Sequence, residues 1–342
     1  MGANRWLGTE DGSTGRLGLL CVAYYLSYVV TGLSLKYFQG AAEAGLPHVP
    51  PVAYLLYSSI GGTILCLGVA VGGGWHRFRG SWRLVLPILP SGVCTAIIVP
   101  ATTVLFSLPI SVMVAMVVMR GSVIVVSRIV DFVQIRQGLL HRQVGWEENV
   151  AVGFALSAVG VHVLWDPSGG FGGSVVGYAV LGVYIAAYAV RIYLMNWFKN
   201  RGLVVLDNRT WFAWEQIVAS GLMALAVAFA LLNGSTDSLS VGLREAVFAA
   251  HPSALPSMLS GLAYGSVAFF SVFIFLFKGR TATFAGLVNR LTSLLAGTTA
   301  TVLFALVFGG SLPKLVDWLS LGLIFVAVAF LTRAERRSAK GR

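Results

Sequence analysis

The stretch from Ser111 to Gln134, SVMVAMVVMRGSVIVVSRIVDFVQ, is apolar over most of its length but carries a charge near its centre. A helix of this length, at about 1.5 Å per residue, crosses the hydrocarbon core of a bilayer. Arg120 is that central charge, and a permanent cation at mid-depth is costly in lipid. We therefore expect it to face a protein interior or a watery cavity. A second apolar run repeats the pattern, because Arg290 follows Thr281 by the same nine residues that separate Ser111 from Arg120.

The composition is that of an integral membrane protein. Of the 342 residues, 57% are hydrophobic and only 11% are charged, whereas soluble domains carry about 25% charged residues. The net charge is +11, but the basic residues are spread over short loops, so no nucleic-acid partner is predicted. The three cysteines lie in apolar runs without metal-ligand spacing and are interpreted as small buried side chains. The first apolar run has no small-residue cleavage site, which indicates a retained helix.

Ten apolar runs are long enough, or nearly so, to span a bilayer. Their hydrophobicity is continuous rather than alternating, which favours helices over strands. The predicted fold is therefore all-α, a polytopic membrane protein of ten transmembrane helices. Prolines at 87, 90 and 100 are expected to kink or break the third run. The ten runs are 17–38, 52–73, 84–106, 111–135, 149–165, 175–198, 210–232, 257–277, 282–308 and 315–332.

The distribution of basic residues predicts the orientation. If the N-terminus is cytoplasmic, the loops on the opposite side hold only Lys36, Arg244 and Lys314, and every cytoplasmic loop is richer. The positive-inside rule then places both termini in the cytoplasm. The longest external segment runs from about 233 to 256. Arginine is much commoner than lysine and glycine is abundant, which favours a bacterial inner membrane over a Golgi or ER membrane.

The chain divides into two halves of five helices each, residues 17–165 and 175–332. A cytoplasmic N-terminal tail (1–16) and a cytoplasmic basic tail (333–342) flank them, and the end of the basic tail, 336–342, is expected to be disordered. An odd number of helices per half makes the halves inverted in the membrane, a design that transporters use. Equivalent positions support the division. Offsets of 160 and 170 residues relate Tyr24 to Tyr184, Tyr28 to Tyr188, Thr31 to Arg191, and Arg120 to Arg290.

Two central arginines at similar depth, one in each half, predict an anion site. A pair of facing guanidinium groups needs an anion between them, and the guanidinium fork suits carboxylate or phosphate. Arg120 and Arg290 are the candidate clamp, with Arg191 as an auxiliary cation and Asn289 beside it. The alternative is that each arginine binds helix carbonyls or an internal acid and is purely structural.

Tyrosines are expected to line the same site. Tyr24, Tyr28 and Thr31 share one helix face, and Tyr184, Tyr188 and Arg191 share another. Such faces could stack a ring or hydrogen-bond the hydroxyls of a substrate. Aromatic packing or an interfacial belt is the alternative.

Two acidic residues lie deep enough to be internal partners. Asp131 follows Arg128 by three residues, so we expect those two to pair on one helix face. Glu215 is assigned as a gate partner or as a protonatable group that couples transport to protons. The alternative for Glu215 is an interfacial carboxylate paired with Arg209. These three residues, Glu215, Asp131 and Arg128, are the gating or coupling candidates.

No motif for catalysis is present. The sequence has no GKS/T phosphate loop, no HExxH and no GxSxG, and its five histidines are scattered. We therefore expect no enzyme activity, no cofactor and no metal ion. The predicted partners are a small-molecule substrate and the lipid bilayer, with a possible homodimer.

The helix pattern and two short phrases resemble the drug/metabolite transporter superfamily. The phrases are Met119-Arg120-Gly121-Ser122-Val123-Ile124-Val125 and Gly286-Leu287-Val288-Asn289-Arg290. Within the superfamily, the chain is most similar to the branch of nucleotide-sugar and triose-phosphate transporters. The resemblance implies alternating access around a central cavity, with the fifth and tenth helices peripheral. It also contains a departure, because many members carry Lys-Arg where this chain has Asn289-Arg290.

The predicted function is secondary transport of an anionic or phosphate-bearing small organic solute, such as a nucleotide sugar or sugar phosphate. The missing lysine leaves room for a singly charged or zwitterionic substrate. The alternative is a proton-coupled exporter of amino acids, drugs or lipid-derived metabolites from the same superfamily. A membrane scaffold or enzyme subunit without transport activity is the third class.

Overall fold

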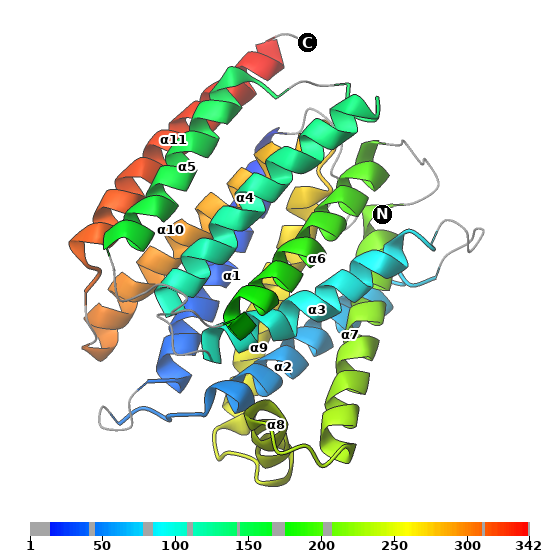
Figure 1. Ribbon diagram of the computed structural model, residues 1–342, viewed down its shortest axis with the longest axis vertical. Coiled ribbons are helices and arrows are strands. Elements are labelled where there is room, and N and C mark those ends of the chain that lie inside the picture. The colour runs from blue at the N-terminus through cyan, green and yellow to red at the C-terminus, as the bar shows by residue number, and fades with distance from the viewer. Residues whose placement is uncertain are drawn as a thin grey trace.

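A computed structural model describes residues 14–40, 45–77, 85–107, 112–141, 144–165, 175–200, 207–309 and 312–340. All of the regular structure in these ranges is α-helical. Figure 1 shows how the helices are arranged. They are α1 (Thr14–Phe38), α2 (Pro51–Gly72), α3 (Ile88–Ser107), α4 (Val112–Arg136), α5 (Trp146–Trp165), α6 (Val175–Asn200), α7 (Asn208–Leu232), α8 (Ser238–Phe248), α9 (Ala254–Phe275), α10 (Ala282–Phe308) and α11 (Leu315–Lys340).

Six of the described helices are long and apolar enough to cross a membrane: α1, α2, α6, α7, α9 and α10. Shorter apolar stretches lie in α3 and α11, at 88–102 and 318–334. Large apolar side chains such as Leu225, Phe229, Leu306 and Phe325 are exposed on the outside of the bundle. An apolar exterior of this kind suits a protein surrounded by lipid, and the architecture is that of a multi-pass membrane protein.

Each of the ten predicted runs overlaps a helix of at least 20 residues, with differences at three places. The segment 233–256 contains α8, an 11-residue helix that begins after Asp237, whose side chain accepts a hydrogen bond from the Ser240 amide at 2.9 Å. The end predicted to be disordered, 336–342, is helical as far as Lys340, because α11 continues to that residue. Leu331 and Ala334 are buried there, and Arg337 forms an ion pair with Glu147 at 2.9 Å.

Local sequence explains several helix ends. Pro51 occupies the first turn of α2, where the missing N–H leaves no hydrogen bond unmade. Pro87 precedes α3, which starts later than expected, and α3 continues through Pro100. At the end of α10, Gly309 has a φ of 71°, the left-handed conformation that glycine adopts without strain.

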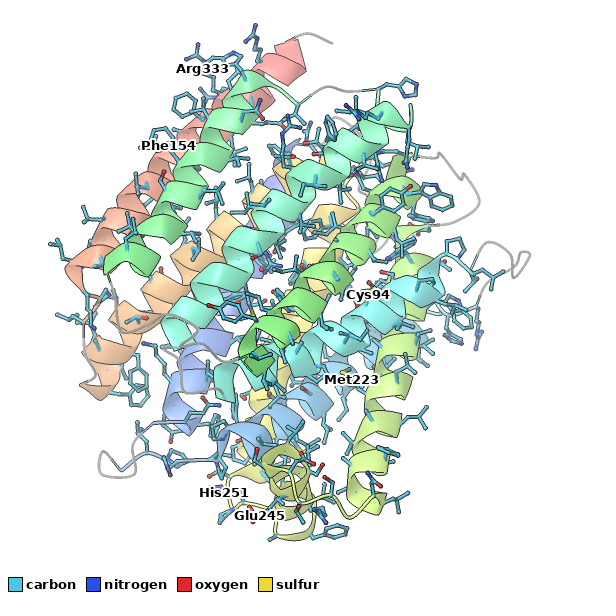
Figure 2. The ribbon with its side chains drawn as sticks, viewed as in Figure 1. Cys94, Phe154, Met223, Glu245, His251 and Arg333 are labelled. Carbon is cyan, nitrogen blue, oxygen red and sulfur yellow. The ribbon has the colours of Figure 1, made fainter. Side chains whose placement is uncertain are left out.

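Consecutive long helices run in opposite directions, which gives the bundle two ends (Figure 1). Glu245 and His251 mark one end, beside α8, and Arg333 of α11 marks the other (Figure 2). These are called the α8 end and the α11 end below. Helix α5 packs along α11 at the edge of the bundle, while α4 contacts α5, α6 and α10.

The closest helix contact joins α2 to α9. Gly61, Gly62, Gly261 and Gly265 face one another across it, and a Cβ on Gly61 would overlap the carbonyl oxygen of Met258. Small residues let two membrane helices approach to backbone contact, where dispersion forces act over many atoms. Helices α2 and α9 therefore pack backbone to backbone at these glycines.

Candidate functional site

The side chain of Arg120 extends from α4 toward α1. Its Nη2 donates a hydrogen bond to the hydroxyl of Tyr28 at 3.1 Å, and its Cζ lies 5.4 Å from the centre of the Tyr28 ring. Only 6% of the residue is exposed. The ring of Tyr24 lies one helical turn away, 5.6 Å from that of Tyr28. The guanidinium is therefore held by an aromatic face and one hydroxyl.

Arg290 on α10 has the same surroundings in the other half of the chain. Its Cζ lies 4.9 Å from the ring centre of Tyr188, whose hydroxyl accepts a hydrogen bond from it. The ring of Tyr184, one turn away on α6, lies 4.8 Å from that of Tyr188. Arg290 is 8% exposed, and its Nε is buried without a hydrogen-bond partner.

The two arginine–tyrosine groups lie close to each other. The hydroxyl of Tyr24, the neighbour of Tyr28 on α1, donates a hydrogen bond to Oδ1 of Asn289, the residue before Arg290, at 3.4 Å. Asn289 in turn donates to the hydroxyl of Ser271 on α9 at 2.9 Å. Arg120 reaches across to α10, because a Cβ on Gly297 would lie 3.9 Å from its Nη1. Most of the predicted binding residues thus belong to one layer, called the arginine–tyrosine layer below. It consists of Arg120, Arg290, Asn289, Tyr24, Tyr28, Tyr184 and Tyr188.

No carboxylate among the described residues pairs with Arg120 or Arg290. A cation–π contact is worth about 0.5–2 kcal/mol, and a hydrogen bond to a charged group about 1.5–3 kcal/mol. Removing a guanidinium from water costs several kcal/mol, so these contacts do not fully replace its hydration. The layer therefore carries two positive charges that lack a protein counter-ion in the described chain. An anion is the ligand that this environment would stabilise.

Glu215 and Arg191 form a buried ion pair beside this layer. Nε of Arg191 lies 2.8 Å from Oε1 of Glu215, and Nη2 lies 3.3 Å from Oε2. Two hydroxyl groups of α3, those of Ser91 and Thr95, also donate to Oε1, at 2.6 and 3.2 Å. Figure 2 labels Cys94 on this stretch of α3. The pair joins α6, α7 and α3, and its two charges cancel.

This geometry decides the alternative left open for Glu215. The interfacial pairing with Arg209 is wrong, because Glu215 is 0% exposed and bonds to Arg191. Arg209 instead lies 3.5 Å from Asp207 and stacks over Trp75. The geometry also limits Arg191, because the cation predicted to assist the clamp is already paired with Glu215.

The expected pair between Asp131 and Arg128 is not formed within the described residues. The Asp131 carboxylate instead accepts backbone hydrogen bonds from Ala282 and Thr283, at 2.7 and 2.6 Å, in the first turn of α10. Unsatisfied amide groups and the helix dipole make that turn a better partner for a buried carboxylate than a half-buried arginine on its own helix. Asp131 therefore links two helices rather than neutralising Arg128.

Sequence reasoning missed the residues that complete these contacts. Ser91 and Thr95 are four residues apart in an apolar helix, which places both hydroxyls on one face, but nothing in the sequence paired that face with Glu215. Ser271 on α9, whose hydroxyl accepts a hydrogen bond from Asn289 at 2.9 Å, was also missed. No group of three or more His, Cys, Asp or Glu in the described residues could hold a metal ion.

No family model matches the chain, and no curated protein matches it either.

Proposed function

We propose that the protein is a secondary transporter that moves an anionic or phosphate-bearing small organic solute by alternating access. Arg120 and Arg290 would bind the anionic group, and the tyrosines would contact the rest of the solute. The observation that carries this proposal is the pair of buried guanidinium groups, which have no carboxylate partner among the residues that the structure describes. Charged residues inside a membrane bundle are expensive and usually belong to a pathway for ions or substrates.

The proposal includes two inverted repeats, α1–α5 and α6–α11 with α8 as an insertion. The pattern of neighbouring helices supports it. The counterparts are α1 and α6, α2 and α7, α3 and α9, α4 and α10, and α5 and α11. If each helix is replaced by its counterpart, the α2–α9 contact becomes α7–α3, α1–α10 becomes α6–α4, and α1–α9 becomes α6–α3. All of these contacts are present. The α5–α11 contact is its own counterpart. The repeated arginine–tyrosine groups follow the same exchange, as expected for a site on a pseudo-two-fold axis.

The charge balance narrows the proposed substrate. Because Arg191 and Glu215 neutralise each other, the layer retains the charges of Arg120 and Arg290. A ligand with two negative charges would balance both, whereas a singly charged ligand would leave one guanidinium without a counter-ion. We therefore favour a dianion, such as a phosphate monoester or a diphosphate. The singly charged or zwitterionic substrate, which the presence of Asn289 in place of a lysine left open, would balance less of this charge. Membership of the drug/metabolite transporter superfamily, with both termini cytoplasmic, remains part of the proposal.

The test begins with purified protein and a panel of nucleotide sugars, sugar phosphates, amino acids and inorganic phosphate, scored by thermal stabilisation. A ligand at 100 times its Kd stabilises the folded state by about 2.7 kcal/mol. Any hit is then assayed for uptake in liposomes with Arg120→Gln and Arg290→Gln. Arg336→Gln, an exposed arginine of α11, is the matched control. Loss of uptake in the first two variants alone supports the proposal, and full uptake in all three overturns it.

The proton-coupled exporter is distinguished by its energy source. It requires transport that depends on a pH gradient and loses that dependence in Glu215→Gln. An anion exchanger instead shows uptake driven by an unlabelled anion on the opposite side, without a pH gradient.

A further inference from the structure

Helices α4 and α10, which carry the two central arginines, are held together by a contact between Asp131 and the start of α10. Oδ1 and Oδ2 of Asp131 accept hydrogen bonds from the amides of Ala282 and Thr283, at 2.7 and 2.6 Å. Asp131 is 0% exposed. These amides belong to the first turn, where the helix has no internal partner for them, so the carboxylate both satisfies them and complements the helix dipole.

The same helix start is held from a second direction. Thr281, the residue before α10, accepts a hydrogen bond from the Phe284 amide at 3.0 Å. Its hydroxyl also donates to Oε2 of Glu148 in the first turn of α5, at 3.0 Å. Two buried carboxylates from two different helices therefore fix one helix N-terminus.

The contact continues along the helices toward the arginine–tyrosine layer. One turn further on, Ser127 of α4 faces Gly286 of α10, and a Cβ on Gly286 would overlap the Ser127 hydroxyl. Arg290 lies four residues beyond Gly286, and Arg120 lies seven residues before Ser127. At about 1.5 Å per residue, the Asp131 contact is about 12 Å from Arg290 along α10. The residues Ser127, Asp131, Ala282, Thr283 and Gly286 are called the α4–α10 seam below.

Polar contacts close the remaining gaps between helices at the α11 end. Asn196 of α6 donates to Oε1 of Gln134 on α4 at 2.8 Å. Lys199, also on α6, donates to the carbonyl of Phe275 at the end of α9, at 3.2 Å. Helices α4, α6, α9 and α10 are therefore joined to one another on the α11 side of Arg120 and Arg290.

The α8 end has no equivalent carboxylate on α10. The offset of 170 residues that relates Arg120 to Arg290 makes Thr301 of α10 the counterpart of Asp131 in the sequence. The Thr301 hydroxyl donates to the carbonyl of Gly297 in its own helix, at 2.9 Å. Helix α10 contains no Asp or Glu along its whole length. Within the described residues, the carboxylate contact is thus found at the α11 end only, although the arginines and tyrosines are repeated in both halves.

We propose that Asp131 is a latch that keeps the α4–α10 seam closed at the α11 end, so that the unliganded protein rests with its anion site shut off from that side. The proposal rests on the proposed function, because a latch of this kind matters only if the two ends open alternately. Opening at the α11 end must separate the Asp131 carboxylate from two amides at once. Toward the other end, α10 has no carboxylate, and its described contacts with α1 there include the Tyr25–Thr299 hydrogen bond and the ring contacts of Phe304 and Phe308, so the resting protein would open there more readily.

The latch is tested by the accessibility of a thiol in the seam. Cys21, Cys66 and Cys94 are first replaced by serine, and Ser127→Cys provides the reporter. A membrane-impermeant maleimide is added separately from each side of sealed vesicles, and the rate of labelling is measured without any ligand. Asp131→Asn retains the size of the side chain but leaves only one carbonyl oxygen to accept the two amides. We expect it to raise labelling from the α11 side at least ~10-fold, the effect of losing about one charged hydrogen bond.

Asp237→Asn is the matched control. Asp237 also accepts a hydrogen bond from an amide in the first turn of a helix, but it is exposed and lies just before α8. It should leave labelling unchanged. Equal labelling of Asp131→Asn and its parent would overturn the latch, as would faster labelling from the α8 side alone. If Asp131→Asn does not fold, Thr281→Val, which removes the hydroxyl bond to Glu148, is judged by the same two criteria. The assay uses no substrate, so a failed latch leaves the result for Arg120→Gln and Arg290→Gln standing, and the reverse also holds.

Discussion

The ion pair between Arg191 and Glu215 gives a prediction whose size follows from the structure. Glu215→Gln removes the negative charge but keeps the shape of the side chain. Arg191, which is 7% exposed, would then be a buried cation beside Tyr188 and Cys94, with no carboxylate partner among the described residues. Removing one partner of a buried pair typically costs about 3–5 kcal/mol, because the other charge is left uncompensated.

Removing both charges should be much less harmful. The double variant Arg191→Met with Glu215→Leu has no buried charge at this position, and such replacements are often neutral or stabilising by about 1–4 kcal/mol. The hydroxyls of Ser91 and Thr95 can turn to carbonyl groups of their own helix, since Thr95 already donates to the Ser91 carbonyl at 3.1 Å. The double variant should therefore be more stable than Glu215→Gln.

Reversible unfolding in mixed detergent micelles measures the free energies, and a double-mutant cycle isolates the interaction. Arg209→Gln is the control, because Arg209 faces an exposed carboxylate, Asp207, at 3.5 Å. A 3.5 Å pair with one exposed partner is worth about 0–1 kcal/mol, and the contact of Arg209 with the Trp75 ring adds about 0.5–1 kcal/mol. The reasoning fails if Glu215→Gln costs no more than Arg209→Gln, or if the double variant is as unstable as the single one.

Three further outcomes are expected. Gly61→Ala should destabilise the protein by at least about 1–3 kcal/mol in the same unfolding assay, because its Cβ would meet the Met258 carbonyl, whereas Gly221→Ala, with nothing within 4 Å, should not. Tyr28→Phe and Tyr188→Phe should each weaken the folded state by about 0.5–1.5 kcal/mol, because the ring remains over its arginine but the hydroxyl acceptor is lost; unchanged stability in both would contradict the contacts described. Hydrogen bonds from Ser235 and then Ser240 lower the pKa of Asp237 from 3.8 to about 2. The stability that Asp237 gives to α8 is therefore complete above about pH 4 and is lost as the pH falls through about 2. Hydrogen exchange of the Ser240 amide should accelerate over that range, and a rate that does not change would refute the role of Asp237 as a helix cap.

The helices could be predicted because each is set by a continuous local run of apolar residues. The run that contains Arg120 and the run that contains Arg290 were assigned to within a residue of α4 and α10. Helix α8 was not predicted, because 11 residues of mixed polarity between turn residues give no signal of a membrane span. The extension of α11 was missed for a similar reason, since its last turns are basic and are held by contacts with α5 rather than by their own apolarity.

The site residues could be named from the sequence, but most of their partners could not. Spacing along one helix identified the tyrosine faces and suggested the pair of Arg128 with Asp131. The true partner of Asp131 is the start of α10, more than 150 residues away in the chain. Contacts between helices depend on how the helices rotate and cross, which one sequence does not specify. The same limit explains why the sequence suggested Arg209, and not Arg191, as the ion-pair partner of Glu215.

The account depends on the proposal that Arg120 and Arg290, which have no counter-ion in the described part of the chain, share one bound anion. Isothermal titration of the best ligand from the panel into the parent, Arg120→Gln, Arg290→Gln and Arg336→Gln proteins tests this directly. Each central substitution removes a charged hydrogen bond to the ligand, worth about 1.5–3 kcal/mol, so the affinity should fall about 10- to 100-fold while Arg336→Gln binds like the parent. Parental affinity in both central variants, for every anion in the panel, would contradict the central claim.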